Sequence, residues 1–352
     1  MSLFKRISIA ILGASLFCSF AFSEGVSDKT SQSNSNVSVG VFNPDTEKNT
    51  ISYDQLESKF GPLPVGSVRG KNITMGVIMK NLANEFWIML GDGITTEAKT
   101  DGIKIDMQAS RTETDTAGQL AIAETMISNN YGALLLSPLT NDNLSSAVDT
   151  AKQKKIPIVN VNCEYIADCD TFVGGRQIEI GTKAAEYIAK KLNGKGKVAI
   201  LEGVPGTFTS IQRLAGFNKK IKEYPGIEVV ASAPADYEME KGLNVTSNIL
   251  TQHPSINAIY ACNDNMALGA VEALRAVNLV GKVIVTGADG TSGAYDSIKR
   301  GEMTATADQF PGINGKAAVD VAIRLLAGQK IPKVVSTPIE MVDKDNMNRF
   351  GK

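Results

Sequence analysis

The sequence predicts an α/β fold in which parallel strands are covered by helices on both faces. From residue 73 onward, short apolar runs rich in Val and Ile alternate with longer stretches whose apolar residues recur at three- and four-residue spacing. The short runs are apolar almost throughout, which indicates burial on both faces of a parallel sheet. About ten such units are too many for one compact open sheet, so the choice lies between two doubly wound lobes and one closed (β/α)₈ barrel.

Run length separates the two kinds of element, because short apolar runs are typical of strands and longer periodic stretches of helices. The runs expected to form strands are 73–79, 103–108, 133–137, 156–161, 198–202, 227–231, 258–262, 283–286 and 304–307. The stretches expected to form helices are 84–99, 114–129, 143–154, 178–192, 210–223, 265–276 and 313–327. Strand and helix alternate along most of the chain, as parallel sheets require.

Composition excludes several classes of protein. The chain has 352 residues, with 36 Lys and Arg against 37 Asp and Glu, so its net charge is −1 and it lacks the basic excess of a nucleic-acid binder. Its single histidine, His253, would have to serve alone in a Ser-His-Asp relay or a multi-histidine zinc site. The Gly-rich run at 287–293 lacks the spacing of a dinucleotide loop, and no contiguous calcium loop is present. We therefore expect no cofactor, no metal and no nucleic-acid partner.

The first residues have the pattern of an export signal. Two basic residues precede a mostly apolar run over 7–22, whose end has the small-x-small sequence of a cleavage site. We predict a signal peptide over 1–23 and a location in the periplasm or at the cell exterior. A membrane anchor is disfavoured because the run is shorter than a spanning helix, and a lipid-anchored form acylated at Cys18 stays open.

Residues 24–71 are expected to form a flexible N-terminal extension. The stretch up to about residue 40 is rich in Ser, Asn, Asp and Lys and has little to bury. The following stretch contains Pro44, Pro62 and Pro64, which break any long element.

Cysteine usage leaves two alternatives. Cys163 and Cys169 are close in sequence and could pair in an oxidising compartment, leaving Cys262 free. Alternatively, all three are small buried thiols.

Polar and aromatic side chains recur just after the predicted strands, where ligands bind in open parallel sheets. The positions singled out are Lys80, Asn84, Phe86, Trp87, Asn162, Tyr237, Asn263, Asp289 and Gln309. Such a set matches a sugar, because planar amide and carboxylate groups can bond adjacent hydroxyls in pairs and aromatic rings can cover apolar C–H faces. The alternative for each position is local, since Asn and Asp are common helix N-caps and an aromatic side chain is more often part of a core.

Arg213 is a further candidate, on the first turns of a predicted helix that follows a Gly-containing loop. The positive end of the helix dipole disfavours a cation there unless the side chain reaches a carboxylate or a ligand. A solvated surface arginine is the alternative.

Several segments of the chain carry a combined family resemblance. They are 80–87, 206–217, 234–237 with 241–244, the run Ala-Cys-Asn-Asp-Asn-Met-Ala-Leu-Gly within 258–270, 287–290 and 303–309. In this order, over about residues 73–345, they resemble the ribose- and allose-binding periplasmic proteins, which are the substrate-binding components of bacterial sugar ABC importers. The resemblance implies two doubly wound parallel-sheet lobes joined by a three-strand hinge, with a sugar held between them.

The resemblance also implies where the lobes begin and end. The N-terminal lobe would comprise 72–176 plus 311–339, and the C-terminal lobe 177–310 plus 340–352. The three crossings would lie near 175–177, 309–311 and 338–341.

Carried over position by position, the resemblance implies a set of sugar contacts. These are Asn84, Trp87, Asn162, Arg213, Tyr237, Asn263, Asp289 and Gln309, with Lys80 similar to the lysine of the allose type. Phe86 would be a second wall residue or part of the core. In two departures, Asn162-Cys163 stands where the ribose type has Asp-Arg, and Ala288 replaces an aromatic residue. The lost charge pair and ring disfavour ribose and leave an allose-like hexose, another pentose or hexose, or a cyclic polyol.

The function that the resemblance implies is a non-catalytic, monomeric protein that closes on a monosaccharide or polyol and delivers it to an ABC permease. One alternative is a sensor of the same fold that passes the sugar to a chemoreceptor or histidine kinase. Another is a secreted barrel glycosidase that uses paired carboxylates such as Glu202 and Asp289. A transcriptional repressor is disfavoured by the predicted signal peptide and the lack of a recognisable DNA-binding head.

Overall fold

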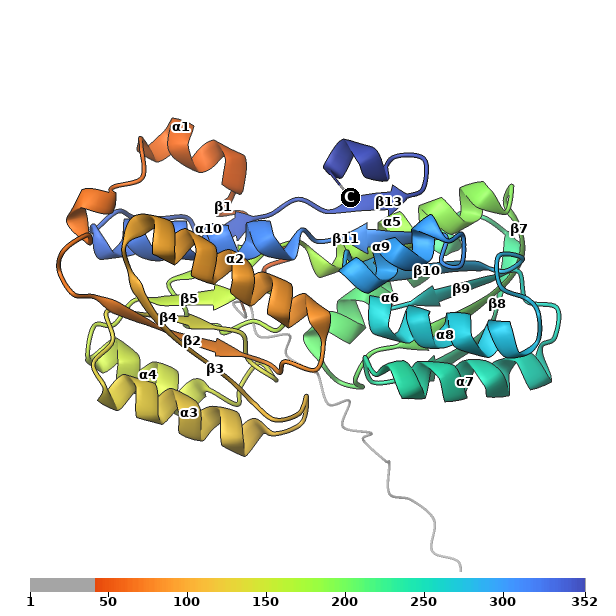
Figure 1. Ribbon diagram of the computed structural model, residues 1–352, viewed down its shortest axis with the longest axis horizontal. Coiled ribbons are helices and arrows are strands. Elements are labelled where there is room, and N and C mark those ends of the chain that lie inside the picture. The colour runs from red at the N-terminus through yellow and green to blue at the C-terminus, as the bar shows by residue number, and fades with distance from the viewer. Residues whose placement is uncertain (1–41, 352) are drawn as a thin grey trace, which may run out of the picture. The chain divides into compact units, whose positions relative to one another are not determined.

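The structure is a computed structural model that describes residues 42–351 (Figure 1). The predicted signal peptide over 1–23, the stretch 24–40 and Cys18 lie outside the described residues. Within the described range, the strands form two separate and mostly parallel sheets with helices packed against them. The expected two-lobed α/β fold is confirmed. The barrel alternative is wrong, because each sheet is open and ends in two edge strands.

The first sheet has seven parallel strands among the described residues, in the order β1-β12-β6-β5-β4-β2-β3. They are β1 (Thr50–Ser52), β2 (Thr74–Met79), β3 (Lys104–Ala109), β4 (Ala133–Leu136), β5 (Ile158–Val161), β6 (Thr171–Gly174) and β12 (Val334–Ser336). Helices α2 (Glu85–Asp101) and α10 (Pro311–Leu326) cover one face, and α3 (Thr116–Ser128) and α4 (Ser145–Gln153) cover the other (Figure 1). Successive residues of β2 therefore enter different cores: Val77 joins Leu90 of α2, and Ile78 joins Met126 of α3.

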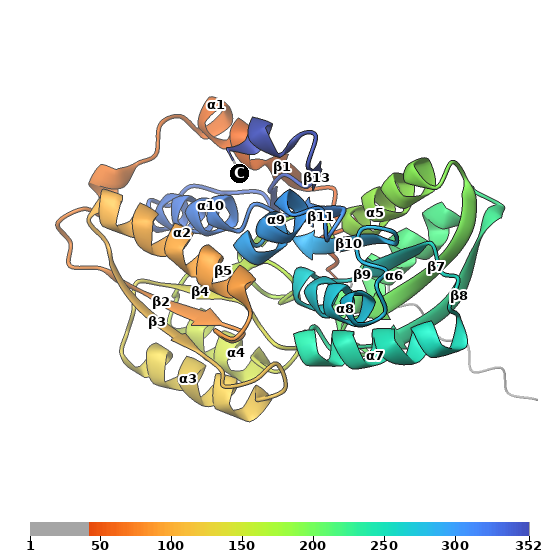
Figure 2. The ribbon, with the colours of Figure 1, turned by 45° about the vertical axis from the view of Figure 1, so that its right-hand side comes forward.

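The second sheet has six strands within 42–351, in the order β13-β11-β10-β9-β7-β8. They are β7 (Lys195–Glu202), β8 (Gly226–Pro234), β9 (Ala258–Ala261), β10 (Ile284–Asp289), β11 (Ala305–Asp308) and β13 (Glu340–Asp343), of which β13 pairs antiparallel with β11. The helices of this lobe are α5 (Gln177–Lys191), α6 (Phe208–Ile221), α7 (Met239–Gln252), α8 (Asp264–Ala276) and α9 (Ser292–Lys299). Helix α5 packs against α6, and α7 packs against α8 (Figure 2).

The chain passes between the two sheets three times. It crosses between β6 and α5, between β11 and α10, and between β12 and β13. These are the segments where the crossings were expected. Each lobe is therefore assembled from separate parts of the sequence, and a hinge of three segments joins the lobes.

Several elements were not assigned from the sequence, namely the short β1, β6, β12, β13, α1 (Leu56–Phe60) and α9, and the longer helix α7. The strands among them have three or four residues, which is too short to show a period. Three of them are nevertheless held by pairing, since β12 lies between β1 and β6 in the first sheet. Pairing with neighbours, rather than a local pattern, makes these segments strands.

Residues 42–71 were expected to belong to a flexible extension and are instead built into the fold. Strand β1 pairs in parallel with β12, and Ile51 and Leu56 are buried in the core of the first lobe. Tyr53 donates a hydrogen bond from its Oη to Oδ2 of Asp320 on α10, at 2.6 Å. The prolines limit the length of the elements in this segment without preventing it from packing.

Asp45 links this segment to the first helix of the second lobe. Its Oδ1 accepts the N–H of Gln177 and its Oδ2 accepts the N–H of Ile178, each at 2.8 Å, so it caps the N-terminus of α5. Burial raises the pKa of Asp45 to about 6, although the two N–H groups and nearby Arg176 act to lower it.

We expect the Asp45 carboxyl to make stability depend on pH. Because the native carboxyl binds its proton more tightly than the unfolded chain does, the free energy of unfolding should fall as pH rises from about 4 to about 6. Asp45→Asn, which resembles the protonated acid, should reduce this fall in urea unfolding measured across that pH range. The exposed Asp54→Asn serves as control and should keep the wild-type dependence. An unchanged dependence in Asp45→Asn would contradict the assignment.

Candidate functional site

A cavity lies at the carboxyl ends of strands from both sheets, with about 300 Å³ of empty space that includes open solvent. Its lining residues come from both lobes and are Lys80, Asn84, Phe86, Trp87, Glu113, Cys163, Thr209, Arg213, Tyr237, Asn263 and Asp289. This is the position at which open parallel sheets bind ligands, because the loops after the strands lead into helix N-termini there.

Eight of the ten predicted site residues line this cavity. They are Lys80, Asn84, Phe86, Trp87, Arg213, Tyr237, Asn263 and Asp289. The other two, Asn162 and Gln309, are fully buried outside the lining and take part in hydrogen bonds at the hinge. Contact of any of these residues with a sugar stays a prediction.

The wall from the first lobe combines a buried cation with two aromatic rings. Lys80 Nζ lies 3.3 Å from Oε1 of Glu164 and 6.0 Å from the centre of the Trp87 ring, and Phe86 packs edge-on against Trp87. Burial by itself lowers the pKa of Lys80, but the carboxylates of Glu164 and Glu113 outweigh it and raise that pKa. The ammonium group therefore stays charged in an almost dry site.

Asn84 and Asn263 are helix N-caps as well as cavity residues. Asn84 Oδ1 accepts the N–H of Phe86, and Asn263 Oδ1 accepts the N–H of Met266, each at 3.0 Å. The same asparagine can therefore be both a helix N-cap and a residue of the cavity wall. Capping fixes the orientation of each side chain with one oxygen, and both residues still face the cavity.

Arg213 is the central group of the wall from the second lobe. Its Nε donates to Oε1 of Gln177 at 2.9 Å, its Nη1 donates to the carbonyl of Cys262, and Nη1 lies 3.6 Å from Oδ1 of Asp289. Only 2% of its surface is exposed, so the alternative of a solvated surface arginine is wrong. The helix dipole is offset by the Asp289 carboxylate, as the sequence argument required.

Asp289 is held between a cation and an amide. Gln309 Nε2 donates to its Oδ1 at 3.0 Å, and Arg213 Nη1 lies 3.6 Å from the same oxygen. Burial raises the pKa of Asp289 well above its ordinary value, while Arg213 and the Gln309 bond act in the opposite direction.

Amide side chains connect the cavity to the hinge. Gln177 Nε2 donates to Oδ1 of Asn162 at 3.1 Å and lies 3.3 Å from Oε1 of Gln309. Asn162 Nδ2 lies 3.4 Å from Oδ1 of Asn314 at the start of α10. Two of the three crossing segments are therefore hydrogen-bonded to one another directly behind the residues that line the cavity.

Several loop residues at the cavity have strained backbones. Cys163, Tyr237 and Asp289 have positive φ angles of 58°, 65° and 135°, and the neighbouring Asn162 has 53°. Residues other than glycine rarely adopt such angles, and the surrounding structure must hold them there. Gly203 is needed beneath Tyr237, because a Cβ at position 203 would lie 2.0 Å from the Tyr237 ring. The loops are thus shaped to aim these side chains at the cavity.

Three lining residues, Glu113, Cys163 and Thr209, were not among the predicted site residues. Glu113 lies between β3 and α3, after the second predicted strand, and the other predicted site residues follow strands in the same way. Cys163 directly follows the predicted Asn162. Thr209 carries no signal in the sequence, and its backbone N–H approaches both oxygens of Glu164 from the other lobe at 3.4 Å.

The three cysteines of the described range are free and buried. Cys163 lines the cavity and belongs to the core on one face of the first sheet, whereas Cys169 belongs to the core on the other face. The alternative of a pair between them is therefore not realised. Burial raises the pKa of the Cys163 and Cys169 thiols to about 12 and that of Cys262 to about 11, so all three are protonated at neutral pH.

Two other positions named from the sequence are not in the cavity lining. Glu202 accepts a hydrogen bond from the Ser232 hydroxyl and does not share the cavity with Asp289, so the carboxylate pair considered for a glycosidase is not assembled there. Ala288 packs with Ile180, Ala307 and Ile339 beside the hinge. Its replacement of an aromatic residue therefore changes the hinge packing and not the lining.

Comparisons with known proteins agree with this geometry. Residues 75–330 match the periplasmic binding protein domain. The chain is similar to the ribose import binding protein of Bacillus subtilis (strain 168), at 36% identity over 280 residues that cover 79% of this chain and 90% of the relative. It is also similar to the D-allose-binding periplasmic protein of Escherichia coli (strain K12), at 35% identity over 277 residues that cover 76% and 89%.

Solved structures show the same similarity. An ABC transporter periplasmic solute binding protein from Actinobacillus succinogenes with bound D-allose has 35% identity and a TM-score of 0.75, covering 79% of this chain and 99% of that one. A solute binding protein from Bacillus halodurans with bound myo-inositol has 31% identity and a TM-score of 0.73, covering 79% and 97%. Within the part of the chain that the structure describes, no helix has the length and apolar character needed to cross a membrane.

The Lys80–Glu164 pair leads to a prediction about stability. Glu164→Gln leaves the buried ammonium group without its carboxylate, and we expect the free energy of unfolding to fall by about 3 kcal/mol. Adding Lys80→Met should restore most of this loss, because the unpaired charge is then removed. Urea unfolding measures both effects. The exposed pair partner Glu272→Gln is the control and should change stability by less than about 1 kcal/mol; an equal effect at both sites would contradict the prediction.

Proposed function

This chain belongs to the periplasmic binding protein family, and from that premise we propose that it binds a monosaccharide or related polyol between its two lobes and delivers it to an ABC import permease. The observation that carries the proposal is a buried cavity whose polar walls come from both lobes. In those walls, Thr209 Oγ1 and Tyr237 Oη are buried and have no hydrogen-bond partner among the described residues. A polyhydroxylated ligand supplies such partners, since each hydroxyl both donates and accepts.

The walls provide the two kinds of contact that a sugar ring needs. Arg213 and Asp289 are planar groups that can each bond two adjacent hydroxyls. Asn84 and Asn263 can donate from Nδ2, although Asn263 Nδ2 already donates to the carbonyl of Tyr237. The rings of Phe86, Trp87 and Tyr237 provide apolar surface for the C–H faces. All of these groups are at least nine-tenths buried, so each bond forms in a site that excludes most water.

Binding would favour the closed arrangement of the lobes. Lys80, Asn84 and the two neighbouring rings belong to the first lobe, whereas Arg213 and Asp289 belong to the second. Only when the lobes meet can one ligand contact both sets, so the ligand has higher affinity for the closed form and shifts the hinge equilibrium toward it. The closed form then presents surfaces of both lobes together to the permease.

The ligand is proposed to leave the site unaltered. The relatives are named as binding proteins, one of them for ribose import and one for an ABC transporter, which supports a role in capture and transfer. We propose that the protein acts as a monomer in the periplasm or at the cell exterior, to which the predicted signal peptide over 1–23 would direct it.

An allose-like hexose or an inositol fits the lining better than ribose. Cys163 lines the cavity at one of the positions where the ribose type carries its charge pair, and its protonated thiol cannot replace an ionic contact. Similar proteins bind D-allose and myo-inositol in their solved structures, while the similar protein of Bacillus subtilis is named for ribose.

Substitution of the central charged groups tests the proposal. We expect Arg213→Ala and Asp289→Ala each to weaken binding of the preferred sugar at least tenfold in calorimetric titration, because each loses a charge-assisted bond of about 1.5 to 3 kcal/mol. D-allose, D-ribose and myo-inositol are the ligands to titrate first, with NMR of the recovered sugar to show that it is unchanged.

Matched controls are available in the same lobe. Arg275→Ala and Asp296→Ala remove partly exposed charges whose partners are surface groups, and both variants should bind as the wild type does. Wild-type affinity in Arg213→Ala and Asp289→Ala would remove the proposed site, and conversion of the sugar to a product would contradict the binding role.

A further inference from the structure

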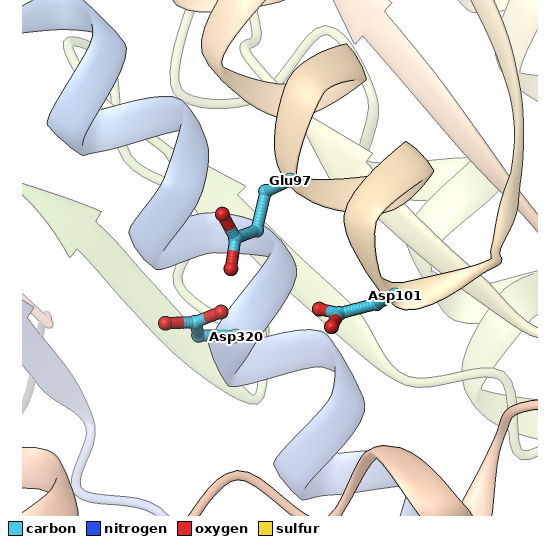
Figure 3. A group of neighbouring side chains, drawn as sticks. All are labelled: Glu97, Asp101 and Asp320. Atoms are coloured by element: carbon cyan, nitrogen blue, oxygen red, sulfur yellow. The ribbon is translucent and has the colours of Figure 1, made fainter.

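Three carboxylates converge between helices α2 and α10, away from the cavity. Glu97 and Asp101 lie one turn apart on α2, and Asp320 faces them from α10 (Figure 3). Each residue contributes one carboxylate oxygen to a set of three, and these three oxygens all lie within 4.8 Å of one another. Asn84 lines the cavity as the N-cap of the 17-residue helix α2 and Asp101 is the last residue of that helix, so about 26 Å separates the two places along the helix.

Two of the carboxylates have oxygens that are buried without a partner. Asp101 is 5% exposed and Asp320 8% exposed, and neither Oδ2 of Asp101 nor Oδ1 of Asp320 has a hydrogen-bond partner among the described residues. Arg69 is close to Asp101, but its hydrogen bonds go to the backbone carbonyls of Thr100 and Asp101 and not to the Asp101 carboxylate. Figure 3 shows the Asp101 carboxylate pointing into the space between the two helices.

The position of Asp101 adds to its need for a cation. As the last residue of α2, it lies at the negative end of the helix dipole, where a carboxylate is unfavourable. A buried carboxylate without a partner is expensive, and native proteins pair such a group with a cation, a donor or a metal ion. The nearby donors bond other oxygens of the cluster. Lys316 contacts Glu97 and Oδ2 of Asp320, and Tyr53 donates to the same Oδ2.

We propose that Glu97, Asp101 and Asp320 form a binding site for a divalent cation, with calcium as the preferred ion. Carboxylate oxygens are hard ligands, and calcium binds oxygens at about 2.3 to 2.6 Å, so two ligands on opposite sides of it stand up to about 5 Å apart. Magnesium needs about 2.0 to 2.1 Å and hence a tighter set, so the spacing of up to 4.8 Å favours calcium. Water molecules complete the coordination.

Lys316 is the resident cation that calcium has to replace. Its side chain is 45% exposed, so the ammonium group can turn into solvent when an ion binds between the three carboxylates. Bound calcium would then connect α2, α10 and, through the bond from Tyr53 to Asp320, the N-terminal segment. A contiguous calcium loop is recognisable from sequence, whereas these three carboxylates come from two helices that are distant in the chain.

Calorimetric titration of the metal-free mature protein with calcium chloride tests the proposal, with magnesium chloride titrated in parallel at neutral pH. We expect a dissociation constant of about 10⁻⁴ to 10⁻³ M for calcium, which is the range of extracellular calcium-binding modules, and weaker binding of magnesium. The midpoint of thermal unfolding should rise with calcium concentration, because the ion binds the folded chain.

Variants identify the ligands. Asp101→Asn should abolish the calcium-dependent shift, whereas Asp92→Asn, at an exposed position on the same helix, should keep it. Lys316→Met removes the competing ammonium group and should tighten calcium binding about threefold or more. Folding of each variant is checked by its sugar binding, which depends on the separate cavity.

Three results would overturn the proposal. The first is the absence of any calcium heat or thermal shift in the wild type and in Lys316→Met. The second is an equal shift in Asp101→Asn, which would place the ion elsewhere. The third is a stabilisation by mild acid that the wild type shows and Asp101→Asn loses, together with no stabilisation by calcium, which would show that a proton is the partner of the buried carboxylate.

Discussion

A buried guanidinium group needs full hydrogen bonding, and this requirement organises the centre of the molecule. Arg213 is the largest fully buried side chain of the described range, and its partners are Gln177 at the hinge, the carbonyl of Cys262 after β9, and Asp289 after β10. Removing Asp289 would leave the guanidinium charge unpaired in a buried environment, and removing the Gln177 amide would leave one buried N–H without an acceptor, and both changes are costly. The arginine therefore holds the hinge and two strand ends in one arrangement and makes the cavity wall rigid.

Amide groups at the hinge are bonded both to one another and to the charged residues of the cavity. Gln177, Gln309 and Asn162 lie behind the lining and exchange hydrogen bonds across two crossing segments. Because an amide both donates and accepts, such a set can exchange partners when the lobes rotate without leaving a buried charge unpaired. Because Gln309 donates to Asp289, a ligand bound as we propose would act on the hinge through this bond.

The N-terminal segment is part of this hinge, although it precedes the range that matches the family. Strand β1 extends the first sheet next to β12, whose end leads to the third crossing, and Asp45 caps α5, which begins just after the first. Tyr53 reaches α10, which begins just after the second. A segment bound to both lobes resists their separation to the extent of these bonds, so its contacts and the ligand act on the same equilibrium.

The sequence by itself determined the α/β class, most strands and helices, and eight lining residues, because periodicity and position after a strand depend only on near neighbours in the chain. Tertiary structure decided what depends on which distant segments meet. It placed Asn162 and Gln309 behind the cavity, brought Thr209 to Glu164 from the opposite lobe, and made strands of segments too short to show a pattern. It also placed Cys163 and Cys169 in cores on opposite faces of the first sheet. The two residues are close in sequence, but the segment between β5 and β6 takes their side chains to different sides.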